Sequence, residues 1–157
     1  MRSLLFTMLL ALFLLSAMNA AASPDVVRQR PFSSAPAWGC TNKQGDKITI
    51  RQRPFTTTPT YDWKDNKGNS GTIRQRPFST TPTFDYSDKS GKRGIIRQRP
   101  FSTTPAFDWT DNTGTRGTSR QRPFSTTPTY DWRDNKGNKG TVRKQPFSTV
   151  PTWVIKK

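Results

Sequence analysis

The sequence predicts a mostly disordered, extended tandem-repeat chain with a weak, repeated β-hairpin tendency, preceded by a signal-peptide helix. The chain has 157 residues with 26 Lys+Arg against 10 Asp+Glu, a formal net charge of +16. Residues 23–157 contain no Leu, Met or Glu, and Ile, Val and Phe make up about 14% of them. Low aliphatic content at high net charge is typical of chains that cannot build a core. All 13 Pro and all 10 Gly also lie in this part.

The first 22 residues form a secretory signal peptide in this interpretation. Arg2 gives the positive start, and residues 4–15 form an apolar run that is shorter than the roughly 20 residues of a membrane span. Small residues end the segment, so we expect cleavage after Ala22, with Ala20 as the alternative site. An uncleaved signal anchor is the less favoured alternative. The sequence therefore predicts a secreted, extracellular protein.

A 23-residue repeat follows a short lead at residues 23–27. Its consensus begins Arg-Gln-Arg-Pro-Phe and continues through Thr-Thr-Pro to a triplet of two aromatic residues flanking an Asp, and then to a Gly-containing turn. The first copy departs most from the others, since Cys40 stands where later copies have an aromatic residue. The five repeats span 28–50, 51–73, 74–96, 97–119 and 120–142, and a truncated sixth spans 143–157.

Each repeat has two halves with different expected structures. In the first half two prolines lie five residues apart, as Pro54 and Pro59 do, which favours an extended, solvated backbone. In the second half residues 61–63 (Tyr-Asp-Trp), a turn rich in Asp, Asn and Gly, and Thr72-Ile73 suggest a short hairpin. An isolated hairpin is marginal in water, so we expect its population to depend on stacking between repeats.

Composition argues against catalysis. The chain has no His, and its mature part has no Glu and one Cys, so the usual general bases and zinc ligands are missing. The run Asp62, Asp65, Asn66 and Gly68 does not match the spacing of an EF-hand loop and is better explained as turn chemistry. We expect no enzymatic activity, no cofactor and no metal site.

The Arg-Gln-Arg-Pro-Phe block is the strongest functional signal. Guanidinium groups bind phosphate and other anions bidentately, and aromatic rings favour a bilayer interface. A purely solubilising charge pattern is the alternative explanation. The predicted polyanion-binding residues are Arg28, Arg30, Arg51, Arg53, Arg74, Arg76, Arg97, Arg99, Arg120, Arg122 and Arg143. The predicted membrane-interface aromatic residues are Trp63, Trp109, Trp132 and Trp153.

Two further features concern covalent modification. Ser/Thr runs beside proline are typical O-glycosylation acceptors, here Thr58, Thr81, Thr104 and Thr127. Cys40 has no second cysteine in the chain, so it is either a free thiol or half of an intermolecular disulfide. The oxidising compartment favours the disulfide, and hence a disulfide-linked homodimer.

The organisation resembles a known class of immune polypeptides. A secreted, Arg/Pro-rich, Thr-Pro-bearing tandem array with an Arg-Pro dipeptide in each of the first five repeats, as at Arg30-Pro31 and Arg53-Pro54, resembles the inducible antimicrobial polypeptides of insects. Its arrangement also resembles baramicin-like precursors of tandem immune peptides. The resemblance implies a role in innate defence.

We therefore predict a secreted cationic repeat polypeptide of innate defence that is antimicrobial through multivalent binding to anionic bacterial envelope components or membrane surfaces. The alternative is a secreted structural, salivary or matrix repeat protein that binds glycosaminoglycan or other polyanions. Nucleic acid is a third polyanion that Arg and stacked aromatic rings would bind.

Overall fold

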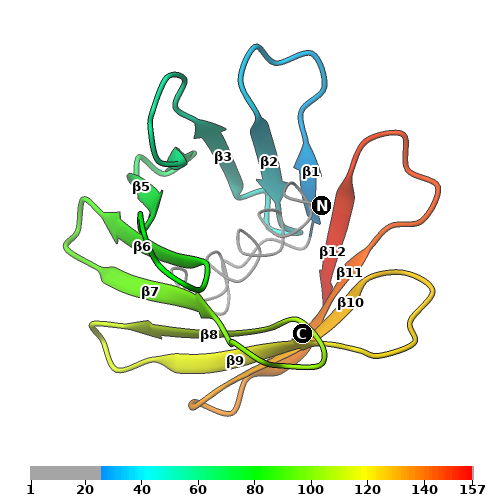
Figure 1. Cartoon of the computed structure of the whole chain (residues 1–157). Coiled ribbons are helices and arrows are strands. Elements are labelled where there is room, and N and C mark those ends of the chain that lie inside the picture. Colours follow the sequence, from blue (N-terminus) through cyan, green and yellow to red (C-terminus); the bar gives the residue numbers. More distant parts are fainter. Residues whose placement is uncertain (1–25, 157) are drawn as a thin grey trace.

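The computed structural model describes residues 26–156, so the predicted signal peptide and its cleavage site lie outside the described residues. Within 26–156, twelve strands form one closed antiparallel barrel in which each strand pairs with the next and β1 pairs with β12 (Figure 1). The strands are β1 Val26–Gln29, β2 Ala37–Thr41, β3 Lys47–Gln52, β4 Thr60–Asp65, β5 Ser70–Gln75, β6 Thr83–Asp88, β7 Arg93–Gln98, β8 Ala106–Asp111, β9 Arg116–Gln121, β10 Thr129–Asp134, β11 Lys139–Lys144 and β12 Thr152–Lys156.

The prediction of a mostly disordered chain is wrong. The core consists largely of Trp, Tyr and Phe rings, and a count of aliphatic residues and Phe omits most of that apolar surface. Each hairpin also gains partners on both sides, because closure leaves no strand edge unpaired. The weak hairpin tendency of one repeat thus becomes one cooperative ring of hairpins.

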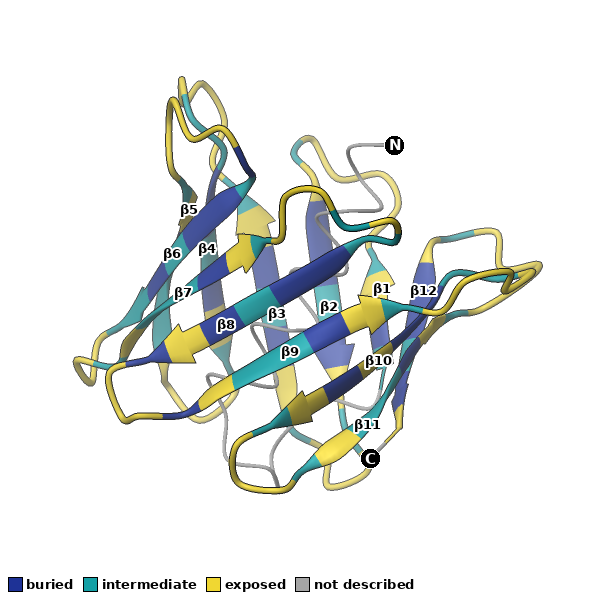
Figure 2. Cartoon of the chain, turned by 60° about the horizontal axis from the view of Figure 1, so that its bottom comes forward, coloured by how far each residue is buried: buried dark blue, intermediate teal, exposed yellow. Residues whose placement is uncertain are grey.

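Alternation along the strands separates the two faces of the barrel. In β4, Tyr61 and Trp63 are buried while Asp62 and Lys64 between and after them are more exposed. The partner strand β5 likewise buries Ile73 and exposes Arg74. The period of two places aromatic and β-branched residues inside and the charged residues outside. Figure 2 shows this alternation as bands of buried and exposed residues along each strand.

Glycine makes room for the aromatic core residue opposite it. Trp63 is the register partner of Gly71, and a Cβ on Gly71 would collide with the Ser87 carbonyl oxygen and lie 2.6 Å from Trp63 Nε1. The same large and small pairing recurs as Tyr86 with Gly94, Trp109 with Gly117 and Trp132 with Gly140.

The first repeat fills this space in the opposite way. Cys40 occupies the position of Trp63, and its register partner is Ile48 instead of glycine. The small residue and the large residue have changed strands, so the pair still fills the interior. Cys40 is therefore a core residue, 1% exposed, because its repeat uses the larger partner on β3.

Strand β1, at the start of the described chain, pairs with β12 of the truncated sixth repeat and so closes the ring. The sequence Val-Val-Arg-Gln of β1 corresponds to Thr-Ile-Arg-Gln of β5, and β1 pairs with β12 as β5 pairs with β4. Val26 and Val27, which the repeat pattern alone leaves in the lead before the repeats, belong to β1 of the barrel. Five internal short turns and one junction between β12 and β1 make up one end of the ring.

Candidate functional site: the loop rim and the arginine belt

Long loops follow every odd-numbered strand, so all of them leave the same end of the barrel. We call this end the rim; its six loops in the described chain span residues 30–36, 53–59, 76–82, 99–105, 122–128 and 145–151. The opposite end carries the short turns, for example 66–69. Both sets of connections are largely exposed in Figure 2.

Each rim loop places a phenylalanine at its tip in an unusual backbone conformation. Pro54 precedes Phe55, whose φ of +58° lies in the left-handed region that favours glycine. The Phe55 side chain is fully exposed. The six tips have φ values of +55° to +58° and exposures of 103% to 105%, at Phe32, Phe55, Phe78, Phe101, Phe124 and Phe147.

Backbone hydrogen bonds fix these loops at their bases. The Arg53 N–H donates to the Thr60 carbonyl at 2.8 Å, which closes the loop on itself. The Gln75 N–H donates to the Pro59 carbonyl at 2.9 Å, which joins the loop to the next one. This second bond recurs around the ring, including Gln29 N–H to the Pro151 carbonyl at 3.0 Å across the β1 and β12 junction. The rim is therefore a linked, preorganised set of loops.

The arginines predicted to bind polyanions lie together next to the rim. One set, such as Arg51, lies on the outer face at the rim ends of the strands, and the other, such as Arg53, begins the loops. All eleven are exposed. We call these eleven residues, Arg28, Arg30, Arg51, Arg53, Arg74, Arg76, Arg97, Arg99, Arg120, Arg122 and Arg143, the arginine belt. The fold thus collects the charges of separate repeats on one outer surface.

Aspartates neutralise part of the belt. Arg53 donates to both carboxylate oxygens of Asp62 at 2.7 Å, and Arg51 is the register partner of Asp62 on β3. Hydrogen bonds from the guanidinium to Asp62 raise the pKa of Arg53 above its ordinary value. The same bidentate pair recurs as Arg76 with Asp85, Arg99 with Asp108 and Arg122 with Asp131. Each internal repeat therefore presents two arginines and one carboxylate.

The junction between β12 and β1 lacks these carboxylates. Gly39 and Val154 stand at the positions equivalent to Asp62, and they are the register partners of Arg28 and Arg143. Arg30 instead donates to the Thr49 hydroxyl at 3.3 Å. The belt is consequently most positive over β11, β12, β1 and β2.

Shallow grooves of about 560 to 630 Å³ recur on the outer face at the repeat spacing. One contains Arg51, Asp62, Lys64 and Thr72, and the other two contain the residues at the equivalent positions two and three repeats further on. Thr118 lines two of the three. Each groove therefore offers cations, a carboxylate and hydroxyl groups in a repeated pattern.

The tryptophans predicted at a membrane interface lie in the core. Trp63, Trp109, Trp132 and Trp153 are 1% to 6% exposed, because they occupy inward positions of β4, β8, β10 and β12. The surface offers the rim phenylalanines instead.

The predicted glycosylation sites lie at the bases of the rim loops. Thr81 is buried, and Thr58, Thr104 and Thr127 are partly buried. The hydroxyls of Thr58, Thr81 and Thr127 accept hydrogen bonds from the side chains of belt arginines, at 3.1 to 3.4 Å.

The burial of Cys40 does not support the predicted disulfide-linked dimer. Its side chain lies in the core, and burial raises the pKa of the thiol, which disfavours the thiolate needed for disulfide formation. In the folded barrel the sulfur therefore lacks the access to a second chain that a disulfide link requires.

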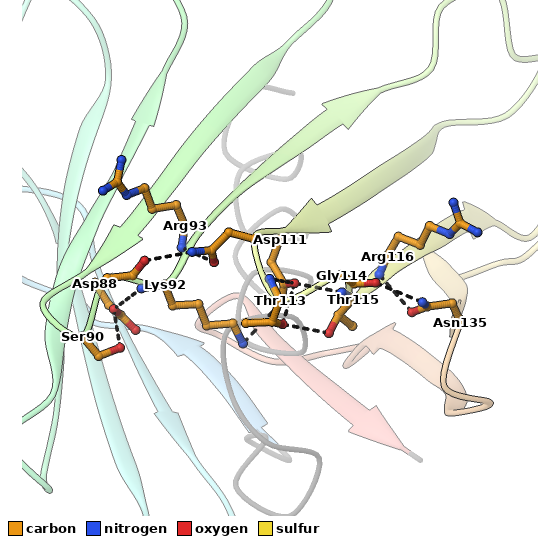
Figure 3. Close-up of polar contacts among 12 residues, drawn as sticks. Asp88, Ser90, Lys92, Arg93, Asp111, Thr113, Gly114, Thr115, Arg116 and Asn135 are labelled. Carbon is orange, nitrogen blue, oxygen red and sulfur yellow. Dashed lines mark hydrogen bonds and ion pairs between the residues drawn. The ribbon is translucent and has the colours of Figure 1, made fainter.

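The short-turn end is held by side chains from neighbouring repeats (Figure 3). Asp111 accepts backbone hydrogen bonds from Thr113 and Thr115 at 2.9 Å, and Asn112 bridges to the preceding turn through the Gly91 carbonyl and the Arg93 N–H. Burial acts to raise the pKa of Asp111, but hydrogen bonds from Thr113 and Thr115 and the charge of Lys92 lower it overall. The second carboxylate oxygen, Oδ2, accepts no hydrogen bond from the described residues and lies 3.5 Å from Lys92 Nζ, so an ion pair to the same turn region completes the contacts of Asp111.

The sequence interpretation missed the phenylalanine tips and the aspartate partners as site residues. A signal existed for both. Each Pro-Phe pair falls in the proline-containing half of the repeat, which is expected to be solvated and so offers an apolar residue no core to enter. An Asp lies nine residues after each second Arg of the internal repeats.

No protein-family model, curated protein or solved structure matches the chain. No helix long and apolar enough to cross a membrane occurs between residues 26 and 156. Over the same span, no three His, Cys, Asp or Glu side chains are grouped as metal ligands would be. The assignment of function therefore depends on the geometry of the rim and the belt.

Proposed function

We propose that the barrel is a multivalent binder of anionic surfaces, with anionic components of a bacterial envelope as its first candidate ligands. The observation that carries the proposal is the arginine belt, in which eleven exposed guanidinium groups encircle one end of a rigid ring. Linked weak sites on a rigid support raise the overall affinity without needing a deep pocket. Arginine suits this task because its planar fork binds phosphate and carboxylate bidentately.

The missing carboxylates at the junction make a specific prediction. Arg28 and Arg143 have no Asp register partner, so their charge is less neutralised than that of the belt arginines that face an Asp across the strands. We expect R28Q/R143Q to weaken binding to lipopolysaccharide and lipoteichoic acid by about fivefold per arginine, since one basic residue near an anionic surface contributes about 1 kcal/mol. Titration of the full chain at low and physiological salt measures the effect.

A matched double variant controls for net charge. R97Q/R120Q removes the same charge from arginines whose register partners are Asp108 and Asp131, and we expect it to weaken binding less. Affinity should also fall steeply with salt for the natural chain. Binding that neither salt nor either arginine pair changes would overturn the proposal.

The outer grooves favour a second candidate, a sulfated polysaccharide such as glycosaminoglycan. Their recurrence at the repeat spacing suits a polymer whose charges also repeat. The same titrations can test this candidate with heparin and with T118W, whose larger side chain would fill two grooves. Heparin binding that T118W abolishes, together with no binding to the bacterial ligands, would favour this candidate over the first.

A further inference from the structure

The rim phenylalanines have no structural role in the barrel that the described contacts reveal. Phe55 is 104% exposed, whereas the core aromatic residues Tyr61 and Trp63 a few positions later are 6% exposed. The tip side chain therefore adds no burial to the folded chain. Phenylalanine repeated at the tips of all six described rim loops calls for a partner outside the chain.

Backbone strain strengthens this inference. Holding a residue other than glycine in the left-handed region costs about 1 to 2 kcal/mol, and the rim does so at every tip. The short turns meet a comparable requirement with Gly68 at a φ of +89°. The rim thus carries strain and an exposed ring at the same position, a combination that marks contact sites.

The loops present these rings in a fixed arrangement. The loop-closing bond from the Arg53 N–H and the loop-to-loop bond from the Gln75 N–H hold the base of the Phe55 loop. The Thr56 hydroxyl, directly after the tip, donates to the Arg53 carbonyl at 3.4 Å. The Phe55 ring is consequently displayed before any partner arrives, which lowers the ordering cost of contact.

The distance between neighbouring phenylalanine tips favours a fluid lipid layer over a rigid protein surface as the partner. Successive tips are separated by two strand spacings, about 10 Å along the ring, so the rings are separate apolar points. Polar loop residues such as Thr56 and Thr57 lie between them. A lipid headgroup layer accommodates separate points of insertion, whereas a protein groove needs one continuous apolar patch.

The arginines next to the phenylalanine tips also favour a lipid layer, one with anionic headgroups. Arg53 lies two residues from Phe55, within about 7 Å along the chain. A ring that enters the interface of a bilayer thus brings a guanidinium to the level of the lipid phosphates. Aromatic side chains favour this interface, and anionic lipids attract arginine.

We propose that the rim docks on a phospholipid bilayer with anionic headgroups, the six phenylalanine tips entering the interfacial layer and the arginine belt contacting the lipid phosphates. The electrostatic part rests on the proposed function, and insertion of the phenylalanines is the new element. A soluble polyanion would contact the belt alone, so the two contributions are separable.

The test compares vesicles with a soluble polyanion. The full chain is cosedimented with phosphatidylglycerol and phosphatidylcholine vesicles, and its binding to heparin is measured in parallel. We expect F55S/F101S/F147S to bind the mixed vesicles about a hundredfold more weakly, from the apolar surface that three rings bury, while heparin binding stays unchanged. Equal thermal unfolding of the variant confirms that the barrel is intact.

A fluorescent probe locates the contact. Cys40 is buried, so F55C labelled with an environment-sensitive dye reports the tip alone, and K67C in an exposed short turn is the matched control. We expect vesicles to shift the emission of the F55C probe to the blue and to leave the K67C probe unchanged.

Several results would overturn the inference. Unchanged vesicle binding by F55S/F101S/F147S with no shift of the F55C probe would show that the tips do not insert, and the proposed function would stand. Phenylalanine-dependent self-association without vesicle binding would assign the rim to a second copy of the chain. No binding to vesicles or heparin by the natural chain would remove the proposed function as well.

Discussion

The two ends of the barrel solve the same backbone problem with different residues. Both need a left-handed residue in their connections, and the short turns use glycine, such as Gly68, while the rim uses phenylalanine, such as Phe55. In the short turns, Asp and Asn side chains also form hydrogen bonds to backbone N–H and carbonyl groups. The short turns thus bond their connections with polar side chains, whereas the rim exposes an aromatic ring at each left-handed position.

We expect the largest loss of stability from a variant that removes a hydrogen-bond acceptor at the short-turn end. Asp111 is buried and accepts hydrogen bonds from the N–H groups of Thr113 and Thr115, so D111A leaves these donors without their acceptor. We expect a loss of about 2 to 4 kcal/mol in the free energy of unfolding, measured by denaturant titration near neutral pH. D108A, which removes a half-exposed carboxylate next to the rim, is the control and should cost much less.

Acid should produce the same loss in the natural chain. The folded pKa of Asp111 is lowered, so its contribution is present above the unfolded value of about 4 and disappears as the pH falls through the folded value. The stability of D111A should depend less on pH in that window. Parallel acid dependence of the two chains would contradict the assigned role.

An intermediate effect is expected from the turn glycine. Gly68 has a φ of +89° and open space where a Cβ would lie, so G68A adds backbone strain without a steric clash. We expect it to destabilise the barrel by about 1 to 2 kcal/mol in thermal or denaturant unfolding. No loss would mean that the short turn tolerates a side chain as the rim does.

The smallest expected effect has the opposite sign. F55N places a residue that tolerates the left-handed region at a rim tip, and the lost ring buries nothing in the folded chain. We expect a gain of up to about 1 kcal/mol in the free energy of unfolding, together with weaker vesicle binding. A destabilised F55N would show that the ring supports the fold, which would remove the contrast between the two ends.

The 23-residue repeat can be read directly from the sequence, which however predicted only weak hairpins in a disordered chain. The sequence was insufficient for the barrel, because the packing of the Tyr61 ring against Trp38 of the preceding repeat is a contact between repeats that the aliphatic content of one repeat does not report. Tryptophan at the surface was a reasonable expectation for an extended chain, but ring closure turns Trp63 inward and leaves Phe55 outside. Cys40 and Ile48 face each other at the positions that Trp63 and Gly71 occupy in the next repeat. The exchange of the large and the small residue between the two strands can be recognised only when the strand pairing is known.

The pairing of β1 with β12 gives the ring no fixed origin. Lys156 and Val26 end the described chain at the place where a sixth short turn would lie, and that junction is equivalent to the turns at residues 66–69 and 112–115. A circular permutant that joins the two ends with a turn of that type and opens at residues 66–69 would trace the same barrel. The order in which the hairpins are translated is therefore separable from the order in which they stand around the ring.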